Sequence, residues 1–269
     1  MKRTVRILFM PALFALLLFL AVMEASSFAQ APAHKPNETT IWQARRMVIE
    51  GLMATNHYYT GLRISSYKFT LDHLDIDISD REHFNIDLTS LPPVFYTEGF
   101  GVRCLLKAEG RMKLPEPLNK WAVDCANGPE VNALRAIAKS FADAVNRLRE
   151  SARNADDPLR AFPQWAAAWR ALATKPPIPE EVRVQRLMAE DAIKENKPGE
   201  ALSYYENGIE LYPTWPEGNF NAALIAAELK YYSDAIEHMQ AYLELVPNAA
   251  DAQAARDKIL IWQIKAKQK

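Results

Sequence analysis

Acidic side chains between residues 70 and 80 are the first group whose types suggest chemistry, because carboxylate oxygens are the ligands that Ca²⁺ prefers. The spacing is not that of an EF-hand, and the segment lacks the glycine that an EF-hand loop requires. Alternate residues of a strand share one face, so a solvated strand face is the interpretation we favour over a metal site. The four residues are Asp72, Asp75, Asp77 and Asp80.

Histidines and glycine-rich loops provide no catalytic motif either. A zinc site at His73, Glu82 and His83 is conceivable, but the five histidines are scattered and none forms a helical His-x-x-x-His pair. The chain has no Gly-x-Ser-x-Gly, phosphate-loop or dinucleotide motif, and only 9 glycines. We therefore expect no enzyme, no metal and no cofactor.

The N-terminus has the three parts of a secretory signal peptide. Positive residues precede an apolar run from Ile7 to Val22, and Ser27 and Ala29 occupy the −3 and −1 positions of a cleavage site. Cleavage would remove residues 1–29 and leave a periplasmic or secreted protein with no transmembrane span. An uncleaved N-terminal anchor is the alternative, although the run is shorter than the roughly 20 residues that span a bilayer.

Composition and charge describe an ordinary globular chain. Hydrophobic residues make up 49% and charged residues 24% of 269 residues, enough for two compact units. Lys and Arg total 32 against 33 for Asp and Glu. A chain this balanced has no overall basic field, so nucleic acid is not expected as a partner.

Residues 41–150, after a disordered leader at 30–40, are predicted to form an α+β unit. Thr40 is placed to cap a helix over residues 41–56. Period-two alternation predicts strands at Tyr67–Leu71, Leu74–Ile78 and Phe84–Leu88, with further strands through residues 94–97, 100–106 and 121–125. A helix over 130–150 follows, and its apolar stripe repeats at helical spacing through Val131, Leu134, Ala138, Phe141, Val145 and Leu148.

This order, an antiparallel meander closed by one long helix, resembles a pleckstrin-homology-like domain. The resemblance implies a small antiparallel β-barrel capped by the C-terminal helix; a different small α+β domain is the alternative. Members of that family that bind inositol phosphates use basic residues near the first hairpin. That hairpin is acidic here, so we do not expect it to bind anionic lipid.

The two cysteines favour a disulfide over a nucleophile, since disulfides persist in exported proteins. Cys104 shares strand parity with Leu106, and Cys125 shares it with Val123, so both point to the apolar side of neighbouring predicted strands. A Cys104–Cys125 bond would close a loop of about 20 residues, worth roughly 3 kcal/mol in the chain-entropy model.

The C-terminal third of the chain repeats itself, after a proline-bounded linker with a short helix at 151–180. Six residues recur exactly 34 positions later: Ala189, Ala192, Ala201, Glu210, Leu211 and Pro213 become Ala223, Ala226, Ala235, Glu244, Leu245 and Pro247. Thirty-four residues is the tetratricopeptide (TPR) period, and residues 180–250 resemble that family. The resemblance implies two helix pairs, at 182–215 and 216–249, within an all-α unit at 181–269 that ends in a capping helix.

The family pattern assigns packing and binding positions to this sequence. The small packing residues are Ala189, Ala201, Ala223 and Ala235, the bulky ones are Tyr205 and Met239, and the prolines that end the second helices are Pro213 and Pro247. First helices line the concave groove in this family, which here implies Arg183, Arg186, Glu190, Lys194, Glu217, Phe220, Leu224 and Glu228. The usual Trp position holds Gln185 and Asn219, and the usual Tyr position holds Ala192 and Ala226.

We therefore expect an exported scaffold protein that binds a peptide or a partner helix in the groove, without catalysis. A small-ligand carrier or an enzyme with its site in the N-terminal unit is one alternative, and a structural subunit of an envelope complex is another. Neither the partner nor the oligomeric state follows from the sequence.

Overall fold

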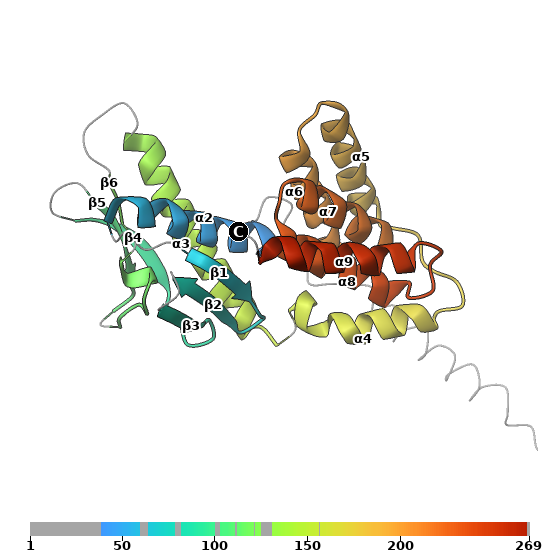
Figure 1. Cartoon of the computed structure of the whole chain (residues 1–269), viewed down its shortest axis with the longest axis horizontal. Coiled ribbons are helices and arrows are strands. Elements are labelled where there is room, and N and C mark those ends of the chain that lie inside the picture. The colour runs from blue at the N-terminus through green and yellow to red at the C-terminus, as the bar shows by residue number, and fades with distance from the viewer. Residues whose placement is uncertain are drawn as a thin grey trace, which may run out of the picture.

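The computed structural model describes residues 39–267, except positions 60–63, 79–81, 100–102, 111, 121, 125–130 and 156. The predicted signal peptide and nearly all of the predicted leader lie outside the described residues. The described chain is a mixed α+β protein in which small antiparallel sheets precede a helical array (Figure 1). None of its described helices combines the length and the apolar composition needed to cross a bilayer.

The β-rich part consists of two separate three-stranded antiparallel sheets. The first contains β1 (Ile64–Phe69), β2 (His73–Ile78) and β3 (Glu82–Asp87); the second contains β4 (Val94–Gly99), β5 (Arg103–Ala108) and β6 (Ala122–Asp124). Within the described residues these sheets stay open, so the predicted closed barrel is unsupported. Each sheet has one apolar face, and the second is covered by helix α3 rather than by continued strand pairing.

Two long helices cover the β-rich part: α2 (Ile41–Tyr59) and α3 (Val131–Arg153). Thr40 caps α2 as predicted: its hydroxyl accepts a hydrogen bond from the Gln43 backbone N–H, and the Gln43 side chain accepts one from the Thr40 backbone N–H. The predicted stripe of α3 is buried at its centre, from Ala138 to Leu148. Asn146 of α3 binds the edge of β4, because its Oδ1 accepts a hydrogen bond from the Val94 backbone N–H and its Nδ2 donates one to the Val94 carbonyl.

The segment predicted as a linker contains helix α4 (Pro158–Ala171), which packs against the array. Asp157 caps it by accepting a hydrogen bond from the Leu159 backbone N–H at 3.0 Å. Ala166 of α4 is fully buried, and Figure 1 shows α4 running along the underside of the array. This segment therefore contributes to the contact between the two parts of the chain.

The C-terminal array consists of five helices in antiparallel succession: α5 (Glu180–Lys194), α6 (Pro198–Leu211), α7 (Pro216–Glu228), α8 (Tyr232–Leu245) and α9 (Ala252–Ala266). Each helix contacts the next. Both ends of α8 lie 34 residues after the ends of α6, so the sequence period is also a structural period. The arrangement is compatible with a helical repeat.

Small residues and turns recur at the same interval. Ala189, Ala201, Ala223 and Ala235 have no exposed surface, as close helix crossings require. The turns that end α5 and α7 place Asn196 (φ 58°) and Lys230 (φ 64°), again 34 residues apart, in the left-handed region. In both turns the backbone N–H of the following residue, Lys197 or Tyr231, donates a hydrogen bond to the carbonyl five residues earlier. This pattern is a Schellman motif.

Candidate functional site

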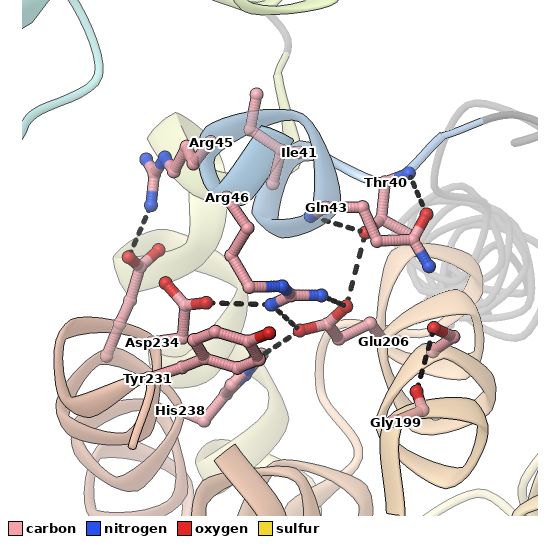
Figure 2. Close-up of polar contacts among 12 residues, drawn as sticks. Thr40, Ile41, Gln43, Arg45, Arg46, Gly199, Glu206, Tyr231, Asp234 and His238 are labelled. Atoms are coloured by element: carbon pink, nitrogen blue, oxygen red, sulfur yellow. Dashed lines mark hydrogen bonds and ion pairs between the residues drawn. The ribbon is translucent and has the colours of Figure 1, made fainter. Parts of the chain in front are cut away.

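The guanidinium of Arg46 lies at the centre of the junction between α2 and the array. Arg46 of α2 donates two hydrogen bonds to Glu206 of α6, from Nη1 to Oε1 and from Nη2 to Oε2, both at 2.7 Å. Arg46 Nη1 also donates to Asp234 Oδ2 of α8 at 2.7 Å. Figure 2 shows the guanidinium between these carboxylates, with the Tyr231 ring 5.0 Å from its carbon. One side chain of α2 therefore joins two helices of the array.

Burial and pairing move the pKa values of these groups in different directions. Burial alone would lower the pKa of Arg46, but the charges of Glu206 and Asp234 raise it above its ordinary value. Burial alone would raise the pKa of Glu206, but the charge and hydrogen bonds of Arg46 hold it below its ordinary value. The pKa of Asp234 rises to about 6, mainly through burial, with Arg46 opposing the rise.

Further contacts surround this ion cluster. Arg45 donates to Glu237 Oε2 at 2.5 Å, and the Ile41 backbone N–H donates to Glu210 Oε1 at 2.6 Å. The Trp42 ring lies against His238, with ring centroids 4.5 Å apart. Every one of these pairs links the first turns of α2 to α6 or α8, so the second helices of the repeats bind a segment of the same chain.

A cavity of about 450 Å³ lies beside the cluster, between the first turns of α2, the β1–β2 turn, the α3–α4 junction and the array. Its wall combines apolar rings, such as those of Trp42, Phe69 and Phe162, with polar groups. The size falls in the range of small-molecule sites. The cavity thus lies at the contact between the two parts, with walls from both.

Some buried polar atoms of the residues beside the cavity lack a hydrogen-bond partner within the described chain. Among the described residues, nothing accepts a hydrogen bond from Trp42 Nε1, and nothing lies within bonding distance of either ring nitrogen of His238. Trp42 is 3% exposed and His238 is 1% exposed. His238 Nε2 lies 3.7 Å from Glu206 Oε1, and the two groups form an ion pair when His238 is protonated (Figure 2).

The residues predicted to line a groove lie on α5 and α7, away from this cavity. On α5, Arg183, Glu190 and Lys194 are exposed and Arg186 is half-buried. Arg186 Nε lies 3.7 Å from Glu190 Oε1, and Arg183 pairs with Glu180 at 3.1 Å. The α5 positions therefore present charged side chains to solvent.

The α7 positions are less open than those of α5. Phe220 and Leu224 are half-buried and pack against the hydrophobic core, while Glu217 and Glu228 are exposed. The Phe220 ring contacts the Tyr242 ring of α8, with centroids 5.0 Å apart. Phe220 thus has packing partners within the array in addition to any role at a surface.

The acidic residues, histidines and cysteines considered from the sequence do not form a site among the described residues. Asp75 accepts a hydrogen bond from Asn85, and Asp77 lies 2.8 Å from His83 Nδ1, all on solvent-facing strand positions. Among the described residues no three His, Cys, Asp or Glu side chains are placed to hold a metal. Cys104 is buried on β5 opposite Val123 of β6. Cys125 lies outside the described residues, so the disulfide stays a prediction.

Sequence reasoning missed the junction and the cavity. Glu210 attracted notice only as a repeated position, and Arg46 and His238 belong to no motif. The sequence did contain a signal for the ion cluster. Acidic residues occur at positions 206 and 234, among alanines and aromatic residues on helices that were predicted to pack together. A buried carboxylate requires a partner, but only the fold shows that the partner comes from α2.

Comparison with family models and with curated proteins assigns no family to this chain. No family model matches it, and no curated protein is significantly similar to it.

Proposed function

We propose that this protein is an exported scaffold that binds a protein or peptide partner on the first-helix side of its helical array, without catalysis. The array is of the tetratricopeptide type in this proposal, and the periplasm or the extracellular space is its location. The groove residues would be those predicted on α5 and α7.

The observation that supports this proposal is the unequal use of the two sides of the array. The second helices, α6 and α8, are covered by α2 and α4 of the same chain. Helix α5 instead carries four large apolar side chains that are about half exposed, Val184, Leu187, Met188 and Ile193. Leu187 lies four residues after Arg183 and three before Glu190, so it shares their helix face. Exposed apolar residues rimmed by charge are typical of interaction surfaces.

Leu187→Ser tests the proposal with little risk to folding. Partner proteins would be captured by crosslinking with the exported protein in envelope extracts, identified, and then titrated against purified variants. We expect Leu187→Ser to weaken binding at least fivefold, because a truncated apolar anchor commonly costs about 1 kcal/mol or more. Its free energy of unfolding should change by about 0.5 kcal/mol or less, as for other exposed positions.

Ile137→Ser is the matched control, because Ile137 of α3 and Leu187 are both 51% exposed. This variant should bind the partner as the unmodified protein does. Equal binding by both variants would place the interaction surface elsewhere and would contradict the proposal. Phe220→Ala is a poorer test, since its contact with Tyr242 makes a loss of stability hard to separate from a loss of binding.

A further inference from the structure

Helix α9 is apolar on two faces, of which the outer one is exposed. Its inner face packs on α8 and includes the buried side chains of Ile259 and Trp262. Its outer face carries Leu260, Ile261 and Ile264, which are 58%, 50% and 58% exposed. A helix that is apolar all round is usually buried within protein. We therefore expect a partner for these three residues, which we call the α9 patch.

Helix α5, at the other end of the succession of helices, has a similar surface. Val184, Leu187 and Met188 are each about half exposed there, and we call them the α5 patch. Helix α7 packs between α6 and α8, whereas α5 packs on α6 and α9 packs on α8. The first and last helices of the array thus each present an apolar face that a further helix could cover.

Carboxylates bracket the α5 patch. Glu181 precedes its first residue by three positions and Asp191 follows its last residue by three, so both lie on the same ridge of the helix. Both are exposed. Residues 180–195 contain five acidic and three basic side chains, and one of the basic ones, Arg183, pairs with Glu180 at 3.1 Å. The surface around the α5 patch is therefore acidic.

Basic residues bracket the α9 patch. Residues 252–267 contain four basic side chains and one carboxylate. Arg256 and Lys258 lie within four residues before the patch, and Lys265 and Lys267 lie within three residues after it. All four are exposed. Since both patches carry their charges at both ends, acidic groups meet basic ones whichever way the two helices run.

We propose that the α9 patch of one molecule binds the α5 patch of a second copy of this chain. The two patches differ, so repeated contacts of this kind produce an open chain of copies or a closed ring. The inference rests on the proposed function, because it names a second copy as a partner for the same α5 surface.

A lipid surface suits the α9 patch less well. Asp257 lies four residues before Ile261 and seven before Ile264, on the same ridge, and it is exposed. A carboxylate at this position is repelled by an anionic bilayer. On α5, Lys194 lies seven residues after Leu187 and provides a basic group beside the patch.

Sedimentation equilibrium of the purified exported protein, over a series of concentrations, tests the inference. The mean mass should rise above that of the monomer as concentration increases. Raising sodium chloride from about 0.1 to about 0.5 M should weaken association severalfold, because it screens the exposed charges. A monomer at every concentration would overturn the inference, as would association that salt leaves unchanged.

Two double variants separate the patches. Leu187→Ser with Met188→Ser removes the α5 patch, and Ile261→Ser with Ile264→Ser removes the α9 patch. Either variant alone should raise the dissociation constant about tenfold or more, with little effect on folding at these exposed positions. An equimolar mixture should regain association and stop at a dimer, because one intact patch of each kind remains. Ile137→Ser, on α3, is the control and should associate as the unmodified protein does.

Other results would assign the patches differently. Undiminished association of the α5 variant alone would mean that α9 binds α9, and undiminished association of the α9 variant alone would mean that α5 binds α5; either contradicts the proposal. A monomer that binds vesicles of phosphatidylcholine and phosphatidylglycerol through the α9 patch would also contradict it. If the purified protein stays monomeric while Leu187→Ser loses a captured envelope protein, this inference fails and the proposed function stands.

Discussion

At the scale of single residues, Asp234 is the weak member of the buried ion cluster. The guanidinium of Arg46 gives Glu206 two hydrogen bonds and gives Asp234 only one. Two carboxylates thus share one positive charge, and their pKa values separate: that of Glu206 falls below its ordinary value and that of Asp234 rises to about 6. Between its ordinary value and about pH 6, Asp234 keeps its proton in the folded protein but loses it in the unfolded chain.

We predict that Asp234→Asn flattens the pH dependence of stability. Since folded Asp234 holds its proton more tightly than unfolded Asp234, its contribution to the free energy of unfolding falls as pH rises from 4 to 7. Asn cannot ionise, so the stability of the unmodified protein relative to the variant should decrease by up to about 3 kcal/mol over this range. Urea unfolding at intervals of half a pH unit measures the difference.

Asp143→Asn is the control, because Asp143 is exposed and, within the part of the chain that the structure describes, pairs only with Lys139 on the same helix face. Its stability curve should run parallel to that of the unmodified protein within about 0.5 kcal/mol. Parallel curves for Asp234→Asn would mean that Asp234 is ionised throughout, and our account of the cluster would be wrong.

At the scale of elements, the crossing of α2 and α3 depends on a glycine. A Cβ atom at Gly51 of α2 would lie 2.2 Å from Cδ2 of Phe141, a buried ring of α3. Contacts that short do not occur without movement, so a side chain at position 51 would push the helices apart. Gly51 therefore allows the β-rich part to be covered by two closely packed helices, even though glycine is a poor helix former.

We predict that Gly51→Ala lowers the free energy of unfolding by about 1–3 kcal/mol, the usual cost of overpacking. Alanine has the higher helix propensity, by about 1 kcal/mol, so propensity alone predicts the opposite sign. Gly199→Ala on α6 is the control, because no atom lies within 4 Å of its added Cβ and stability should be unchanged or higher. Adding Phe141→Leu to Gly51→Ala should recover part of the loss; no recovery would reject the proposed clash.

At the scale of the whole molecule, α2 belongs to both parts of the chain. It packs on α3 through its middle and binds α6 and α8 through its first turns. Helix α4 closes a second contact against α8. These contacts also enclose the cavity, so the two parts are expected to unfold together and to keep the cavity only while they are joined.

We predict that Arg46→Met weakens this union. Without the guanidinium, Glu206 and Asp234 are left buried without a counter-charge, which typically costs about 3–5 kcal/mol. Thermal unfolding followed by circular dichroism and by tryptophan fluorescence should show one transition in the unmodified protein and two non-coincident transitions in the variant. Arg183→Met removes only an exposed pair with Glu180 and should change stability by about 0.5 kcal/mol or less. Coincident transitions and unchanged stability in Arg46→Met would contradict the joining role.

The sequence by itself determined the features that depend on near neighbours or on a period. Thr40 predicted the start of α2, because a capping side chain bonds to a backbone N–H only two or three residues further on. The apolar stripe around Phe141 predicted α3, and the 34-residue interval predicted paired helices whose turns recur at Asn196 and Lys230. The signal peptide and the Cys104–Cys125 bond stay predictions from composition, strand parity and spacing.

Only the tertiary structure decided how these elements are assembled. Alternation predicted strands, but a period of two marks which face of a strand is apolar and does not say whether a sheet closes, so the barrel was unsupported and two open sheets were found. The ion cluster joins Arg46 to residues 160 and 188 positions away, and no local pattern links them. The cluster and the cavity arise when α2 lies across α6 and α8, because burial there makes the guanidinium a required partner for two carboxylates and encloses a cavity with walls from both parts of the chain.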